Sequence, residues 1–160
     1  MIEVGQALPE TRFSISTDEG MKTLTTATIF ANRRVVLVAV PGAFTPTCSN
    51  IHLPGFIKIL PALKERGIDD VVCLSVNDPF VMRAWAQSQG VEGKITMLAD
   101  GNADFTRKIG MDFDGSGAGL GIRSLRYNMV VANGIVKDIY LEPNPGACEM
   151  TQAAHLLENI

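Results

Sequence analysis

The sequence has few cysteines, little net charge and no long apolar run. Only three cysteines, Cys48, Cys73 and Cys148, occur in 160 residues, and an odd, sparse set argues against a secreted domain held together by disulfides. The net charge is −3, which argues against a phosphate-binding surface, so nucleic acid is not an expected partner. The longest strongly apolar stretch is Val35 to Val40, whereas a membrane-spanning helix needs roughly 20 apolar residues, so no membrane partner is expected.

The composition suits a packed, cytoplasmic protein. Hydrophobic residues make up 46% and charged residues 19% of the chain, which predicts one domain over residues 1–160. Residues 1–5 contain neither a basic nor an apolar segment, so we expect no secretory signal. In a reducing compartment a cysteine is either a small buried side chain or a working thiol, and the three cysteines have to be told apart.

Strands and helices are predicted to alternate along most of the chain. Continuous β-branched runs favour strands that are buried on both faces, and Asn133-Gly134 is a strong β-hairpin signal between the last two strands. The expected strands are a ribbon over 11–26 and single strands over 35–40, 71–76, 95–98, 127–132 and 135–141. The expected helices are 56–66, 79–89, a short stretch ending at 109, and about 151–160. This order predicts an α/β fold, with a central mixed sheet and helices on both faces, that is compatible with a thioredoxin-like fold.

Cys48 lies in the segment of the sequence best suited to chemistry. It follows a predicted buried strand and a Pro41-Gly42 turn, and it should sit in the first turn of a helix. Unpaired backbone N–H groups and the positive end of the helix dipole favour a thiolate at that position. Thr45, three residues earlier, can place a hydroxyl beside the sulfur, to donate to the thiolate and accept from a bound hydroxyl group. These polar neighbours favour a reactive thiol over an inert buried one.

Residues 41–49, Pro-Gly-Ala-Phe-Thr-Pro-Thr-Cys-Ser, continue into His-Leu-Pro-Gly-Phe at 52–56. This stretch resembles the active-site signature of the peroxiredoxins, and within them the type II, or peroxiredoxin 5, subgroup. Segments 73–82 and 123–134 match the same subgroup. The resemblance implies a thioredoxin-like fold and a thiol-dependent peroxidase that reduces hydrogen peroxide and alkyl hydroperoxides. It also implies a homodimer, since dimers in this family pack near the active site.

The resemblance assigns a role to four residues. Cys48 matches the peroxidatic cysteine, which attacks a peroxide oxygen and becomes a sulfenic acid, and Thr45 matches the threonine that hydrogen-bonds both thiolate and peroxide. Arg126 matches the arginine that holds the thiolate and stabilises charge while the O–O bond breaks. Pro41 matches the proline that shields the sulfur from water. The chemistry agrees, because fixed donors aimed at the developing charge lower the barrier and an arginine does not deprotonate.

The other two cysteines are possible resolving thiols. A sulfenic acid must be returned to a thiol or it risks over-oxidation, and members of the subgroup do this in different ways. Cys73 lies in a predicted buried strand and is expected to fill the core, whereas Cys148 lies in a predicted loop and is expected to be more accessible. We predict turnover through Cys48 alone, with glutaredoxin and glutathione, or thioredoxin, as the external reductant. A Cys48–Cys148 disulfide is the alternative.

Weaker patterns leave other readings open. The spacing of Cys48 and His52 can place two metal ligands on one helix face, but a structural zinc site needs more ligands than these two, so no metal or cofactor is expected. The glycines at 115–121 lack the spacing of a phosphate loop, and residues 112–121 are expected to form a flexible, glycine-rich loop before Arg126. A disulfide oxidoreductase would need a C-x-x-C pair, which is missing. A redox sensor whose Cys48 oxidation signals to a partner is the non-enzymatic alternative.

Overall fold

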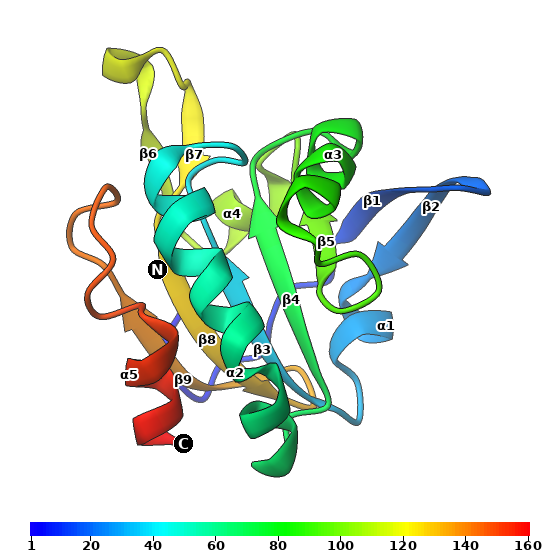
Figure 1. Ribbon diagram of the computed structural model, residues 1–160, viewed down its shortest axis with the longest axis vertical. Helices are drawn as coiled ribbons and strands as arrows, with labels where there is room; N and C mark the ends of the chain where they lie inside the picture. The colour runs from blue at the N-terminus through cyan, green and yellow to red at the C-terminus, as the bar shows by residue number, and fades with distance from the viewer.

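A seven-stranded mixed sheet runs through the protein in the computed structural model, which describes residues 1–160 (Figure 1). The strand order is β2-β1-β5-β4-β3-β8-β9. These strands are β1 (Arg12–Thr17), β2 (Gly20–Thr25), β3 (Arg34–Ala39), β4 (Asp70–Ser75), β5 (Thr96–Ala99), β8 (Tyr127–Ala132) and β9 (Ile135–Leu141). β3, β4 and β5 are parallel neighbours, and the pairs on either side of them are antiparallel. The predicted mixed sheet is therefore confirmed.

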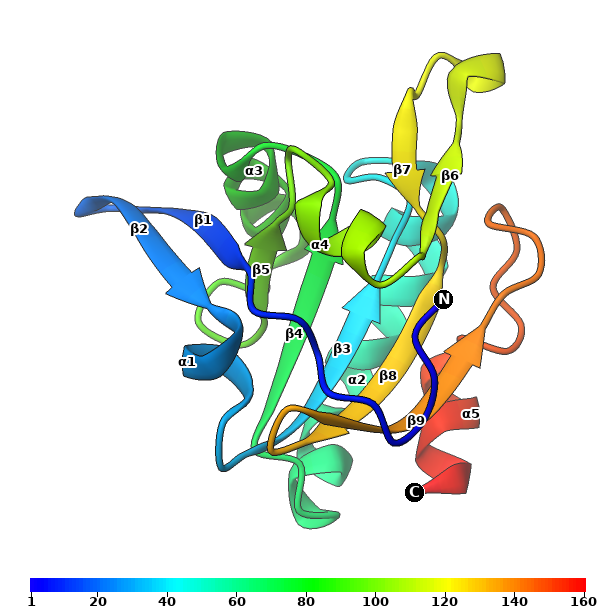
Figure 2. The ribbon, with the colours of Figure 1, turned by 180° about the vertical axis from the view of Figure 1, so that it is seen from behind.

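Helices cover both faces of the sheet, as Figures 1 and 2 show. The helices on one face are α2 (Leu53–Glu65), α3 (Pro79–Gln89) and α5 (Ala153–Asn159), and those on the other are α1 (Thr26–Phe30) and α4 (Asp104–Lys108). Alternate side chains of β3 enter the two cores, since Val36 and Val38 belong to the first and Val35 and Leu37 to the second. A continuous β-branched run is stable there because water reaches neither face.

The register of β3 and β8 positions the functional site. Ala39, the last residue of β3, pairs with Tyr127, the first residue of the antiparallel β8. The segment that leaves β3 and the segment that enters β8 therefore lie side by side at the same end of these two strands. Pro41 and Arg126, which are far apart in sequence, lie in those two segments.

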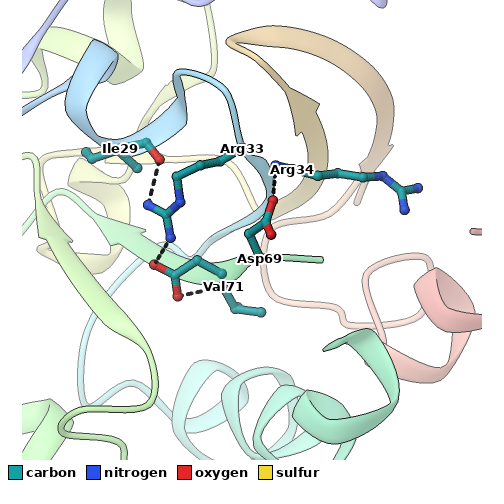
Figure 3. Close-up of polar contacts among 6 residues, drawn as sticks. Ile29, Arg33, Arg34, Asp69 and Val71 are labelled. Atoms are coloured by element: carbon teal, nitrogen blue, oxygen red, sulfur yellow. Dashed lines mark hydrogen bonds and ion pairs between the residues drawn. The ribbon is translucent and has the colours of Figure 1, made fainter. Parts of the chain in front are cut away.

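The opposite end of the same strands is held by charged side chains (Figure 3). Arg33 donates to the Ile29 carbonyl and to the Asp70 carboxylate, each at 3.0 Å. The backbone N–H of Arg34 donates to the Asp69 carboxylate at 2.8 Å. These contacts fasten the start of β3 to the start of β4, away from the site.

Three features differ from the sequence-based expectations. Residues 112–121 do not form a plain loop, because β6 (Asp112–Asp114) pairs with β7 (Ile122–Ser124) in a hairpin that projects from the body (Figures 1 and 2). Helix α1 was not predicted from the sequence, and the helix expected from residue 56 begins three residues earlier, at Leu53. None of the helices combines the length and apolarity needed to cross a bilayer.

Candidate active site

The backbone after β3 turns sharply before it enters a helix. Gly42 allows this turn to pack closely, since a Cβ atom there would lie 2.9 Å from Arg123 Nη1. Phe44 adopts a left-handed conformation with φ of 63°, which is strained for a bulky residue. Strained backbone of this kind is found often at functional sites. The helical chain then begins, and Cys48 lies in its first turn, as predicted.

Cys48 opens a π-helical segment, Cys48–His52, that runs directly into α2. The N–H of Leu53 donates to the Cys48 carbonyl, a contact of the i to i+5 type. Single π turns within α-helices occur often at functional sites. The Cys48 side chain is completely buried, so its reactivity depends on the groups that touch the sulfur.

Arg126 is the group that touches the sulfur. Its side chain is 1% exposed, and its Nη2 donates to Cys48 Sγ at 3.1 Å. The Nε atom donates to the Pro145 carbonyl at 3.1 Å, and no carboxylate lies within ion-pair distance of the guanidinium. A buried cation without a counter-ion is costly, so a thiolate on Cys48 supplies the charge that this arrangement lacks.

Thr45 and Pro41 belong to the turn before Cys48, and the hydrogen bond of the Thr45 hydroxyl is not the one expected from the sequence. The Thr45 hydroxyl donates to the Gly42 carbonyl at 2.6 Å, so its only hydrogen is not available to the thiolate, while its lone pairs can still accept. Pro41 is buried, and its carbonyl accepts from Arg123 Nη1 at 3.3 Å. Arg123 was not singled out from the sequence, although it lies only three residues before Arg126.

A cavity of about 360 Å³ opens at this point. Its lining residues come from the active-site turn, the β6–β7 hairpin, the start of β8 and the loop after β9, and they are Pro41, Thr45, Pro46, Thr47, Phe113, Leu120, Arg126, Asn144, Pro145 and Gly146. Three of the four predicted catalytic residues therefore line one cavity, and the fourth, Cys48, accepts a hydrogen bond from one of them, Arg126.

His52, which the sequence singled out only by its spacing from Cys48, is a member of the site. Its ring is fully buried, with Nδ1 3.0 Å from Arg126 Nη1 and Nε2 2.7 Å from Asn128 Oδ1. Burial, together with the neighbouring charge of Arg126, lowers the pKa of His52 to about 3, so the ring is neutral at physiological pH. No group of three metal-ligating side chains gathers here or elsewhere in the structure.

Neither of the remaining cysteines has a charged donor hydrogen-bonded to its sulfur. Cys73 is fully buried in β4, and burial, with the nearby Cys48 charge, raises the pKa of its thiol. Cys148 was expected to be accessible, but it is only 8% exposed, and burial raises its pKa as well. All three cysteines are free thiols.

The burial of Cys148 follows from the way its loop is folded. The carboxylate of Glu142, itself 2% exposed, accepts from the backbone N–H groups of Glu149 at 2.5 Å and Thr151 at 2.8 Å. Burial alone would raise the pKa of Glu142, but these hydrogen bonds outweigh it and lower the pKa. The acid therefore stays charged and draws the loop, with Cys148, against the protein.

Comparison with known proteins identifies the family of this chain. The family model described as Redoxin matches residues 3–157. The chloroplastic peroxiredoxin-2E-2 of Oryza sativa is 45% identical over 162 residues, which covers 98% of this chain and 72% of the rice protein. The chain belongs to the peroxiredoxins. It is therefore a thiol peroxidase, an oxidoreductase that acts on peroxide.

Solved peroxiredoxin structures have the same architecture. The crystal structure of reduced Prx3 from Vibrio vulnificus, in complex with H₂O₂, is 46% identical, with a TM-score of 0.93 and 99% of each chain covered. Peroxiredoxin 5 from Alvinella pompejana is 31% identical, with a TM-score of 0.85 and all of both chains covered. The predicted thioredoxin-like fold and the resemblance to the peroxiredoxin 5 subgroup are thereby confirmed.

Proposed function

We propose that this peroxiredoxin reduces hydrogen peroxide and alkyl hydroperoxides through a sulfenic acid at Cys48. The observation that carries the proposal is the 3.1 Å contact between Arg126 Nη2 and Cys48 Sγ, made by a buried guanidinium that has no carboxylate partner. The thiolate attacks one peroxide oxygen, an S–O bond forms and the O–O bond breaks. The leaving oxygen takes a proton and departs as water or an alcohol.

Each neighbour has a defined task in that step. Negative charge moves from sulfur to the leaving oxygen, and the fixed N–H groups of Arg126 stabilise it along this path. Thr45 accepts a hydrogen bond from the peroxide, because its own hydrogen is directed to Gly42. We expect Pro41, which is buried, to shield the sulfur from water. The functional role of these four residues is tested by substituting each of them and measuring the rate constant with hydrogen peroxide.

The shape of the cavity supports organic peroxides as substrates. Phe113 and Leu120, from the hairpin, and Pro145 present apolar surface beside Arg126, and apolar walls favour an alkyl group over water. Second-order rate constants for hydrogen peroxide, tert-butyl hydroperoxide and cumene hydroperoxide test this. A strong preference for hydrogen peroxide over both organic peroxides would contradict it.

The burial of the other cysteines supports an external reductant, either glutaredoxin with glutathione or thioredoxin. A thiolate is the attacking species in thiol–disulfide chemistry, and burial raises the pKa of both Cys73 and Cys148. Peroxide consumption with each couple in parallel identifies the reductant. Intact mass after one equivalent of peroxide tests the mechanism: an added oxygen or thiol adduct fits an external reductant, whereas the loss of two hydrogens would indicate an internal disulfide with Cys148.

We also propose a cytoplasmic location and a homodimer that packs near the site, and exposed apolar side chains support the dimer. Phe44 is 55% exposed in the turn after β3, and Phe80 is 66% exposed in the helix after β4. Because β3 and β4 are parallel neighbours, both residues lie at the same edge of the sheet as Cys48. Sedimentation velocity with Phe44→Ser and Phe80→Ser variants tests the dimer, and cell fractionation tests the compartment.

A further inference from the structure

The buried residues behind Arg126 form a chain of hydrogen bonds that the peroxidase reaction does not by itself explain. His52 lies between Arg126 and Asn128, with contacts of 3.0 and 2.7 Å. Asn128 Nδ2 then donates to the Thr151 carbonyl at 2.7 Å. All of these side chains are essentially inaccessible to water, so their donors and acceptors have to be paired with one another or with the backbone.

The donors and acceptors in this chain can be assigned in only one way. A guanidinium has N–H donors and no acceptor, so His52 Nδ1 must offer its lone pair to Arg126. The neutral ring then carries its hydrogen on Nε2 and donates to Asn128 Oδ1. Asn128 is oriented by its own donation to the Thr151 carbonyl, which leaves its oxygen facing the ring. Every contact is therefore a donor–acceptor pair with a fixed direction.

Three nitrogen atoms of the Arg126 guanidinium donate to three different segments of the polypeptide. Nε donates to Pro145, Nη1 to His52 and Nη2 to Cys48. The first two contacts fix the plane of the guanidinium, and the third then points at the sulfur. Orientation of this kind matters for the rate, since a misplacement of about 1 Å can lower a rate about 100-fold.

The neutral state of His52, the acceptor for Arg126, matters as much as its position. A carboxylate at position 52 would also orient Arg126, but it would form a buried ion pair and neutralise the charge that faces the sulfur. The charged groups near the ring are Arg126 and, farther away, Glu142, and the Phe56 ring lies 5.7 Å from it, centroid to centroid. Burial and Arg126 both oppose protonation, so His52 remains an uncharged acceptor.

We infer that His52 is a positioning residue, which orients Arg126 toward Cys48 while leaving the full positive charge of the guanidinium for the sulfur. The inference rests on the proposed role of Arg126 at Cys48. If His52 only filled the core, its substitution would lower the stability of the protein but leave the reactivity of a folded variant unchanged. The two cases therefore differ in measurable ways.

Nitrogen NMR on the native enzyme tests the assignment without any substitution in the site. In protein labelled with ¹⁵N at histidine, His52 is expected as the neutral tautomer with hydrogen on Nε2, without titration between pH 5 and 8. The signals of His155, the other histidine, are assigned with a His155→Gln variant. A His52 ring with hydrogen on Nδ1, or one that is charged at pH 6, would overturn the inference.

Two variants test the effect on chemistry. His52→Leu removes the acceptor, and His52→Asn keeps an oxygen near the position of Nδ1. In the Leu variant, the rate constant with hydrogen peroxide at pH 7 should fall about 10- to 100-fold, and iodoacetamide should alkylate Cys48 more slowly at the same pH. The Asn variant should recover most of both properties, whatever its thermal stability.

The possible failures are distinguishable. A folded His52→Leu variant that reacts and alkylates as the parent does overturns the inference, as does a folded Asn variant that is as impaired as the Leu variant. If the Leu variant does not fold, the Asn variant and the tautomer decide. An Arg126→Gln variant with normal peroxide reactivity would instead overturn the proposed function itself.

Discussion

Cys48 and Cys73 are both completely buried in the same hydrophobic cluster, yet their surroundings differ in one decisive respect. Cys73 lies in β4 between Val38 and Met97 of the neighbouring strands, and no hydrogen-bond donor reaches its sulfur. Cys48 has the guanidinium of Arg126 at 3.1 Å. Burial therefore does not decide whether a cysteine of this protein works; the presence of a charged, oriented donor does.

The backbone adds to the same difference. The N–H and C=O groups of Cys73 belong to a strand with a partner on each side, so none of them is free to interact with an anion. Cys48 begins a helical segment, where N–H groups are available and the helix dipole favours negative charge. Two sulfur atoms in one core thus differ in the groups that surround them.

The sharpest test of this comparison is to remove each thiol in turn. Cys48→Ser should abolish peroxide consumption, because the nucleophile is lost, while Cys73→Ala should retain the parental rate constant. Stopped-flow measurements with hydrogen peroxide and a saturating thiol reductant give both values. Substantial turnover by the Cys48→Ser enzyme, or an inactive but folded Cys73→Ala enzyme, would break the comparison.

The next largest effect is expected from removing the charge that distinguishes the two sulfur atoms. Arg126→Gln should lower the rate constant with hydrogen peroxide about 10²- to 10³-fold, the range for loss of an oriented donor to a developing charge. Arg33→Gln is the matched control, because Arg33 pairs with Asp70 at the opposite end of the sheet. If both variants lose activity equally, general destabilisation rather than Arg126 is responsible.

The free energy of unfolding should fall in acid because His52 is buried in its neutral form. Its pKa falls from 6.5 to about 3 on folding, so between these values the unfolded chain binds a proton that the folded protein does not. The free energy of unfolding should therefore decrease as the pH falls below 6.5, by up to about 1.4 kcal/mol per pH unit from this group. Urea unfolding at pH 7, 6 and 5 should show a shallower decrease in His52→Asn than in the parent, and parallel curves would contradict the expectation.

The smallest effect is expected at Cys73 itself, in stability rather than in activity. Cys73→Ala removes one buried sulfur and leaves a small cavity, which should lower the free energy of unfolding by about 1 kcal/mol. Chemical denaturation at pH 7 measures it. A Cys73→Ala loss well above that of an ordinary core truncation would show that this thiol does more than fill space.

The fold was largely predictable because its signals are local. The β-branched run before Pro41 and the Asn133-Gly134 turn identify strands from a few neighbouring residues, and the structure shifts most of their ends by only a residue or two. The β6–β7 hairpin was missed because its glycine-rich sequence has no alternating pattern. Its formation depends on backbone contacts such as Gly115 N–H to the Gly121 carbonyl, at 2.6 Å.

The site was predictable only in part, since its contacts join distant segments. Local chemistry singles out Cys48, but the link to Arg126, 78 positions away, came from the resemblance to a family. The contact between His52 and Asn128 spans 76 positions and has no periodic or motif signal. The expected exposure of Cys148 was wrong, because the buried carboxylate of Glu142 organises its loop through backbone groups that a sequence pattern does not reveal.

The pairing of β3 with β8 also has a consequence for how the enzyme comes into being. Arg126 reaches Cys48 only after Ala39 and Tyr127 have met, and contacts between residues so far apart close a long loop and tend to form slowly. A newly made or unfolded chain therefore carries an ordinary cysteine at position 48. Fast reaction with peroxide begins only when β3 and β8 have paired, and the enzyme's own chemistry thus reports on the completion of the centre of its sheet.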